Sequence, residues 1–442
     1  MEHSLAHIEG LDRSPVAATA ELHTLRRQLQ RPLADAGVPS DQVIDELAAA
    51  VEGGIIGSAG GRFFGWVIGG ATPAALAADW LTSAWDQNAA LYACSPAAAV
   101  AEEVAGAWLK ELLGLPETAS FALVTGCQTA HLTCLAAARH RLLAKAGWNV
   151  EERGLAGSPV IRILTGEHGH STLDRAVRLL GLGSSNIEKL PVDSQGRLST
   201  EALEKALSNE PTIVVLQAGD INLGAYDDFE KLIPLAREHG AWIHVDGAFG
   251  LWAGASPRLR HLVKGIEKAD SWATDGHKWL NVPYDSGYAF VADPEAHRAS
   301  LSQKAPYISH DESARDQMNW NPEWSRRARG FPTYAAIREL GRSGIEEMID
   351  RCCGHARALA RGIGALPGAE VLWESEINQG LVRFGDDART DQVIAAINRT
   401  GEAFFGGTTW RGKRAMRISV CNWRTSEEDV ARAIGAARVA LS

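Results

Sequence analysis

The chain has 442 residues, of which 45% are hydrophobic and 22% charged, and its formal net charge is −10. This length and composition predict a large folded domain with one or two smaller ones, and they exclude a disordered or repeat protein. Because Lys and Arg are scattered through an acidic chain, no basic patch for nucleic acid or for an anionic membrane is expected, and a small molecule is the expected partner.

No segment predicts a membrane anchor or a metal site. No apolar run approaches the roughly 20 residues that span a bilayer, and residues 1–15 lack the basic flank and apolar core of a secretion signal. We therefore expect a cytoplasmic protein. The cysteines show no zinc-ligand spacing and predict reduced thiols; they are Cys94, Cys127, Cys134, Cys352, Cys353 and Cys421.

The first part of the chain predicts helices. Residues 18–37 and 40–54 carry apolar side chains at helical spacing. The second helix is expected to begin with Ser40 as its N-cap and to end at Gly53 and Gly54. We expect residues 1–85 to form an N-terminal helical arm.

Short β-rich segments recur from residue 120 onward, with helical patterns between several of them. The predicted strands are 120–126, 158–166, 212–219, 241–247, 270–276 and 287–293. Such alternation predicts a mostly parallel sheet covered by helices on both faces. Ligands of such sheets bind beyond the carboxyl ends of the strands, so we expect the site there, in a large domain of residues 86–330.

A change of pattern follows the large domain. Residues 326–363 predict a long helix, and the β-rich segments 370–385 and 413–423 then predict a smaller α+β unit. We expect a boundary near residue 330 and a small C-terminal domain of residues 331–442.

Two charged side chains stand at predicted strand ends. Asp246 is the next-to-last residue of the predicted strand 241–247. Lys278 comes two residues after the predicted strand 270–276. A charge at the end of a buried strand needs an opposite charge, strong hydrogen-bond donors or a covalent use. The two side chains could simply pair with each other, or one ligand could use both.

Two further features favour a ligand. His170 offers a flat ring at another strand end, and residues 125–139 (TGCQTAHLTCLAAAR) run from a glycine-containing turn into a helix N-terminus, which favours an anion. Pyridoxal phosphate matches all of them, with its phosphate on the turn, its ring on His170, its ring nitrogen on Asp246 and its aldehyde on Lys278. His170 could instead be a core histidine. We predict no metal, because the pair His168 and His170 lacks a third ligand at a useful spacing.

Eight segments in family order make the chain similar to the fold-type I, group II pyridoxal-phosphate decarboxylases, which include aromatic-L-amino-acid, histidine and glutamate decarboxylases. The segments are FFGWVIGGATPAALAADWLTSAWDQN, SPAAAVAEEVAGAWLKELLGLP, TGCQTAHLTCLAAAR, HSTLDRA, HVDGAFG, DGHKWLNVPYDSG, SRRARGFPTYAAIRELG and RISVCNWRTSEEDV. The resemblance covers almost the whole chain. It implies an α/β, aspartate-aminotransferase-like large domain with a mostly parallel seven-stranded sheet, and a homodimer with active sites at the subunit interface.

The resemblance also implies a set of site residues. Lys278 is the Schiff-base lysine, Asp246 pairs with the ring nitrogen and keeps it protonated, and His170 stacks on the ring; these three are the catalytic candidates. The residues implied to bind the cofactor are Gly126, Cys127, Gln128, Thr129, His170, Asn222, Asp246, Ala248, Asp275, His277 and Lys278. In a dry, partly cationic site we expect a lowered pKa for the Lys278 amine.

The chain departs from the family pattern in the phosphate turn, where small residues usually stand in place of Cys127 and Gln128, and in the mobile loop. A mobile loop of the aromatic-amino-acid decarboxylases carries a tyrosine that returns a proton to the substrate carbon, and the nearest position here is Gln317. Glutamine is not a general acid. The proton could come from His170, Tyr307, Lys278 or water, or the reaction could end in oxygen-dependent formation of an aldehyde.

The substrate class rests on a few candidates. Arg417 is the small-domain cation expected near the substrate carboxylate, although a structural arginine would fit the same sequence. Trp66 and Tyr307 are the other substrate-binding candidates, and the aromatic residues at 63, 64, 66 and 85 could form an apolar wall or part of the core. We predict decarboxylation of an aromatic L-amino acid to an amine and CO2. The alternatives are an acidic or other polar substrate, an aldehyde synthase, an aminotransferase, and a cofactor-binding protein without activity.

Overall fold

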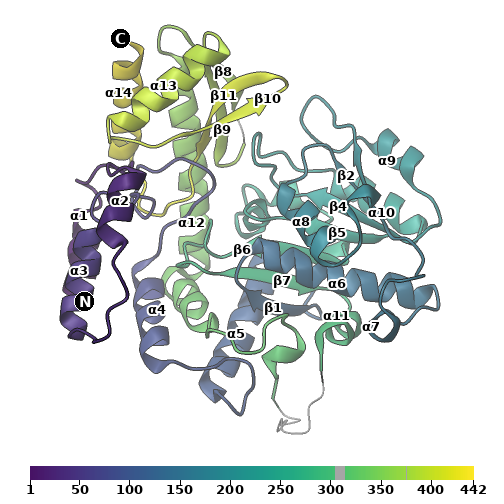
Figure 1. The fold of residues 1–442 in the computed structure, drawn as a ribbon. Coiled ribbons are helices and arrows are strands. Elements are labelled where there is room, and N and C mark those ends of the chain that lie inside the picture. Colours follow the sequence, from purple (N-terminus) through teal and green to yellow (C-terminus); the bar gives the residue numbers. More distant parts are fainter. Residues whose placement is uncertain (304–313, 375) are drawn as a thin grey trace.

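The computed structural model describes residues 1–303, 314–374 and 376–442, and its centre is a seven-stranded sheet (Figure 1). The strands are β1 (Ser120–Val124), β2 (Arg162–Gly166), β3 (Ile187–Leu190), β4 (Thr212–Gln217), β5 (Trp242–Asp246), β6 (Ser271–Asp275) and β7 (Gly287–Val291). Their order is β1-β7-β6-β5-β4-β2-β3, and β7 alone runs antiparallel to its neighbours. The predicted mostly parallel sheet is confirmed.

Apolar residues on both faces of the strands explain why helices cover both sides of this sheet. In β4, Ile213 and Val215 pack into a core with α6 (Cys127–Lys145) and α8 (Ser171–Leu179). Val214 and Leu216 pack into a second core with α5 (Pro96–Leu113) and α10 (Phe229–Glu238). Because successive side chains point to opposite faces, alternate residues of β5 also face α6.

A second, antiparallel sheet lies near the C-terminus. It has the order β10-β11-β9-β8 and consists of β8 (Ala369–Glu374), β9 (Gln379–Phe384), β10 (Gly406–Trp410) and β11 (Lys413–Ser419). The helices α13 (Asp387–Arg399) and α14 (Glu427–Leu441) accompany it (Figure 1).

The long helix α12 (Gly330–Gly364) connects the two sheets and confirms the long predicted helix, with an interruption at Gly341, where φ is 59°. It packs on α5 and α4 (Pro73–Trp85) as well as on α14. The predicted boundary at residue 330 therefore falls at the start of an element shared by both units. We propose the division into residues 1–85, 86–330 and 331–442 on this basis.

The N-terminal segment is helical, with α1 (Glu2–Gly10), α2 (Leu22–Leu29) and α3 (Ser40–Ala50) before α4. The helix predicted over 18–37 is shorter than expected and ends three residues before Pro32, which disfavours helix in its neighbourhood. The predicted N-cap is wrong by one residue, because Pro39 is the N-cap and Ser40 begins α3 without a side-chain cap. No described helix is both long and apolar enough to cross a lipid bilayer.

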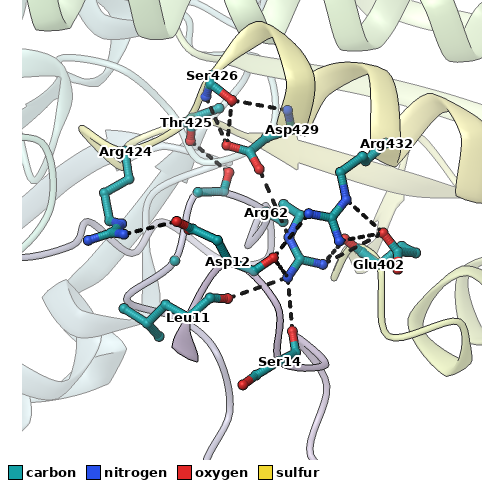
Figure 2. Close-up of polar contacts among 12 residues, drawn as sticks. Leu11, Asp12, Ser14, Arg62, Glu402, Arg424, Thr425, Ser426, Asp429 and Arg432 are labelled. Atoms are coloured by element: carbon teal, nitrogen blue, oxygen red, sulfur yellow. Dashed lines mark hydrogen bonds and ion pairs between the residues drawn. The ribbon is translucent and has the colours of Figure 1, made fainter. Parts of the chain in front are cut away.

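Arg62 ties the N-terminal segment to the C-terminal unit (Figure 2). Its guanidinium is buried and donates to the carbonyls of Asp12 (3.1 Å), Ser14 (2.9 Å) and Glu402 (2.9 Å). The carboxylate of Asp429 lies 3.9 Å from its Nε. One planar side chain thus satisfies backbone acceptors from segments nearly 400 residues apart, a geometry that an ammonium does not reproduce.

We predict that Arg62→Lys destabilises the protein, because buried carbonyls lose their donors at about 1–3 kcal/mol each. The matched control is Arg424→Lys. Its guanidinium lies 3.2 Å from the carboxylate of the exposed Asp12, and such a surface ion pair contributes about 1 kcal/mol or less to stability. Thermal unfolding and limited proteolysis between residues 15 and 61 measure both variants. Equal effects of the two substitutions would contradict the role given to Arg62.

Candidate active site

The carboxyl ends of β1, β5 and β6 meet at one edge of the large sheet. β1 leads through Gly126 into α6, β5 ends on Asp246, and β6 ends on Asp275, three residues before Lys278. The turn after β1 lies very close to β7, because a Cβ on Gly287 would stand 2.3 Å from the Cα of Gly126. Only glycine at position 287 permits this approach.

Lys278 is paired with Asp275 and not with Asp246. Its Nζ lies 2.9 Å from Asp275 Oδ2. Burial lowers the pKa of Lys278, but the charge of Asp275 and the hydrogen bond to it outweigh burial and raise that pKa above its ordinary value. The expected lowering of the Lys278 pKa did not include a carboxylate so close, and the pairing with Asp275 acts in the opposite direction.

Asp275 also reaches the N-terminus of α6. Its Oδ1 accepts a hydrogen bond from the Cys127 backbone N–H at 2.5 Å, and His277 Nε2 lies 3.5 Å from the same oxygen. The Asp275 carboxylate thus contacts the Lys278 ammonium, the His277 ring and the N–H groups at the N-terminus of α6, each of which carries positive charge or donates a hydrogen bond. Asp275 is the electrostatic centre of the edge formed by β1 and β6.

Asp246 is buried beside this cluster with different partners. Its Oδ1 accepts from the Ala248 backbone N–H at 3.2 Å, and the Cys127 thiol lies 4.0 Å from the same oxygen. His131 Nε2 lies 3.7 Å from Oδ2. Since Lys278 pairs with Asp275, the carboxylate of Asp246 retains the capacity to bind a further cationic group.

The tautomer of His277 follows from a backbone contact. The Ser286 N–H donates to His277 Nδ1 at 3.2 Å, so the neutral ring carries its proton on Nε2, the nitrogen that faces Asp275. Burial lowers the pKa of His277 and favours this neutral form. The ring stacks on Tyr284 at 4.4 Å, a contact that the sequence did not predict.

His170 is the N-cap of α8 and is held by its own helix. The Thr172 N–H lies 3.4 Å from His170 Nδ1, and the Thr172 hydroxyl lies 2.8 Å from the same atom. Burial lowers the pKa of His170, so the ring is neutral near pH 7, with Nε2 as its donor. The main electrostatic influences on it are Asp246, Lys278, Arg417 and Asp275, in that order, so the predicted site residues do assemble around it.

Three further candidates lie toward the C-terminal sheet. Asn222 accepts a hydrogen bond from the Thr408 hydroxyl at 2.9 Å, which holds its amide oxygen. Arg417, on β11, is buried and donates to the Trp66 carbonyl at 3.2 Å, while its Nε has no described partner. Trp66 has a left-handed backbone (φ 47°) and a half-exposed side chain.

Tyr307, a candidate for proton return, and Gln317, the position that departs from the family tyrosine, differ in what the structure describes. Tyr307 lies outside the described residues. Gln317 is fully buried in a short 3-10 helix, and Arg315 donates to its side-chain oxygen. Its buried position gives it no contact with Lys278 or His170 among its described interactions.

The residues present fit pyridoxal phosphate. Gln128 Nε2, in the first turn of α6, is buried without a described partner, which is the expected state of a donor that awaits an anion. Gln128, Thr129, the α6 N-terminus and His277 would hold the phosphate, Ala248 and His170 would flank the ring, and Asp246 would meet its nitrogen. When bound to Lys278, the cofactor supplies an electron sink for the pair left at the substrate Cα.

The comparison with known proteins agrees with this assembly. A model of the family described as "Pyridoxal-dependent decarboxylase conserved domain" matches residues 23–385. The chain belongs to this family. It is a pyridoxal-phosphate-dependent amino-acid decarboxylase, and pyridoxal phosphate is its cofactor.

Relatives and solved structures extend over most of the decarboxylase. The aromatic-L-amino-acid decarboxylase of Bacillus atrophaeus is 27% identical over 447 residues, which cover 96% of this chain and 90% of the relative. Histidine decarboxylase of Rattus norvegicus is 28% identical over 383 residues, which cover 81% and 57%. The structure of Oryza sativa TDC with PLP and tryptamine shares the fold with a TM-score of 0.92 at 24% identity, over 99% of this chain and 95% of that one.

We predict that Asp275→Asn moves cofactor attachment to lower pH. Only the neutral Lys278 amine attacks the aldehyde, so a raised pKa means that the attachment rate increases with pH up to that pKa. Removal of the carboxylate should shift the profile down by about 1–3 pH units. Absorbance of the cofactor-free protein mixed with pyridoxal phosphate measures the rate. Asp285→Asn removes a carboxylate that pairs with Arg329 at 2.6 Å and is not in contact with Lys278 among its described interactions, so it should keep the wild-type profile. An unshifted Asp275→Asn profile would contradict the assignment.

Proposed function

We propose that this decarboxylase converts an aromatic L-amino acid into the corresponding amine and CO2. The observation that carries the proposal is an aromatic stack beside Arg417. Trp66 stacks on Phe404 at 5.5 Å and on Phe63 at 5.9 Å, and its carbonyl receives the Arg417 guanidinium. A half-exposed indole backed by two rings is suited to a further aromatic ring.

Arg417 is suited to the α-carboxylate of the substrate. Burial lowers its pKa to about 10, which leaves it charged at neutral pH, and Asp220 is the acid that most supports the charge. Its Nε has no described partner, so a carboxylate can bind without displacing an existing hydrogen bond. An acidic substrate would need a second cation for its side chain, and Lys278, which with Arg417 acts on His170, is used by the cofactor in this proposal.

In the proposed site, Lys278, Asp246 and His170 act on the reacting atoms. Lys278 binds the cofactor, and Asp246 holds a proton at the cofactor ring nitrogen. His170, neutral with its proton on Nε2, can orient the carboxylate or return a proton to the substrate. Asn222 would contact the cofactor from the side of β10, and Asp275 would keep Lys278 in position.

The relatives carry names from several substrate classes. Aromatic-L-amino-acid decarboxylases of Bacillus atrophaeus and Drosophila lebanonensis are 27% and 29% identical to this chain. Relatives named histidine decarboxylase and acidic amino acid decarboxylase are 28% and 27% identical. Identity therefore separates the classes poorly, and the aromatic stack is the better argument.

We predict CO2 and amine in equal amounts from tryptophan, tyrosine or another aromatic L-amino acid, with little CO2 from glutamate, aspartate or histidine. Trp66→Ala should raise KM about 2- to 10-fold, since an aromatic pair contributes about 0.5–1.5 kcal/mol. Parallel assays of CO2, amine, aldehyde and peroxide measure the outcome. CO2 mainly from acidic substrates, aldehyde with peroxide, or exchange that depends on a keto acid would each overturn the proposal.

We predict that Arg417→Met lowers kcat/KM about 10- to 100-fold, because a charge-assisted hydrogen bond to the substrate is lost. Arg414→Met is the matched control on the same strand, because the Arg414 guanidinium pairs at 2.8 Å with the carboxylate of Asp391, which is exposed. Steady-state kinetics with the best aromatic substrate compare the two variants. Equal kinetics for Arg417→Met and Arg414→Met would mean that Arg417 is only structural.

We further propose that the enzyme is a homodimer with active sites at the subunit interface. Several large apolar side chains of the first helices are 44–63% exposed, more than a monomer usually leaves on one segment; they are Leu22, Leu29, Val43, Ile44, Leu47, Leu81 and Trp85. A second copy of the chain would cover them.

The cytoplasmic location stays a prediction.

Light scattering during gel filtration tests the dimer. We expect twice the mass of the 47.4 kDa chain, and Ile44→Glu with Leu47→Glu should shift the protein toward the monomer with loss of activity. A fully active wild-type monomer would contradict the proposal. Glu52→Lys, a charge change just after the same helix, serves as the control.

A further inference from the structure

Behind Asp246 lies a chain of buried side chains that the roles described so far do not use. His131 Nε2 lies 3.7 Å from Asp246 Oδ2, and His131 Nδ1 lies 2.8 Å from His244 Nε2. His244 Nδ1 lies 2.8 Å from the Ser271 hydroxyl, which accepts the indole N–H of Trp242 at 2.9 Å. Both histidines and Ser271 are fully buried, so their partners are the atoms of this chain.

The fold makes this chain continuous. Residues 242, 244 and 246 alternate along β5 and therefore face the same side of the sheet, where α6 packs. His131 lies one helical turn after Cys127 on α6, so it points at the same strand end as the first turn of that helix. Ser271 begins the neighbouring strand β6 and closes the far end.

The direction of the hydrogen bonds can be derived from their ends. Burial lowers the pKa of both histidines, so both are neutral and only one proton lies between His131 Nδ1 and His244 Nε2. If that proton were on His131, a bare Nε2 lone pair would face the Asp246 carboxylate, which is repulsive. If it is on His244, His131 carries Nε2–H toward Asp246 and the Ser271 hydroxyl donates to His244 Nδ1. The second arrangement satisfies every donor and acceptor, because the Trp242 indole can only donate.

We propose that His131 and His244 are positioning residues that hold the Asp246 carboxylate in place for the cofactor ring nitrogen by directing an N–H toward Oδ2. The 3.7 Å contact is longer than a hydrogen bond, and the Cys127 sulfur lies 3.4 Å from the same nitrogen, so His131 acts mainly through its dipole. Two titratable groups touch His131 directly, Cys127 and His244. The other charged or titratable groups that act on it are Asp246, Asp275, His170 and Lys278. A carboxylate held in this way would keep the ring nitrogen protonated, whatever amino acid the enzyme uses.

The first test uses the cofactor-free protein and nitrogen NMR of ¹⁵N-labelled histidine, assigned with the single variants. We expect both His131 and His244 to be neutral with the proton on Nε2. A proton on His131 Nδ1 would overturn the proposal, because the lone pair would then face Asp246. This readout depends neither on the substrate nor on activity.

The second test follows the ring nitrogen of bound ¹⁵N-labelled pyridoxal phosphate against pH. In the wild type we expect it to stay protonated throughout the range in which the protein is folded, whereas in His131→Phe it should lose its proton within that range. kcat should fall about 10- to 100-fold, as for other outer partners of reactive groups, with little change in KM. A ring nitrogen that stays protonated in His131→Phe would overturn the proposal.

Two variants separate this role from packing. His244→Gln can still donate to His131 and accept from Ser271, so it should restore the wild-type titration, whereas His244→Leu should resemble His131→Phe. His297→Gln is the control, because His297 is an equally buried histidine on Ser120 (2.8 Å) and the Trp320 carbonyl, away from Asp246. The positioning role is refuted if the cofactor ring nitrogen titrates alike in His244→Gln and His244→Leu. It is also refuted if His297→Gln shifts that titration.

Discussion

The ion pair between the partly buried Lys278 and the buried Asp275 determines the electrostatics of the whole site. Two carboxylates and one ammonium share the same edge of the sheet, and the ammonium is 2.9 Å from Asp275. Asp246 is therefore left with a backbone N–H, a thiol and a histidine as its described partners. A buried carboxylate with only such partners favours a cationic ligand. The protonated ring nitrogen of pyridoxal phosphate is such a ligand.

The segment around Trp66 links the architecture to this chemistry. Gly69 passes directly over Lys278, since a Cβ on Gly69 would lie 1.9 Å from the Lys278 carbonyl oxygen, and its N–H donates to the His277 carbonyl at 3.3 Å. Arg62 fastens the start of the same segment to the C-terminal unit. The same segment carries Trp66, whose carbonyl accepts from Arg417 of the C-terminal unit. In the proposed function, the N-terminal segment therefore contributes to the active site as well as to the subunit interface.

The sequence predicted the elements with strong apolar patterns and the reactive residues at their ends. Six strands and the long helix are confirmed, but β3 was missed because its sequence IEKL has two exposed charged residues and no apolar alternation. The Ser40 cap is wrong by one residue. These misses concern local signals that tertiary packing overrides.

Within the site, spacing found which residues gather but not how their charges pair. Lys278 had two acids within reach, Asp246 and Asp275, and only the coordinates distinguish them. His131 was recognisable as a helical neighbour of Cys127, but its link to His244 depends on the packing of α6 on β5, which no local pattern encodes. The family resemblance contributed nothing at Gln317, where this chain departs from the family.

A crystal structure of the enzyme with pyridoxal phosphate would show whether Lys278 carries the cofactor and whether Asp246 faces its ring nitrogen. We expect continuous density from Lys278 Nζ into the cofactor, hydrogen-bond distance between the ring nitrogen and an Asp246 oxygen, and the phosphate at the N-terminus of α6. A cofactor joined to another lysine, or one whose ring nitrogen lies away from Asp246, would contradict this assignment.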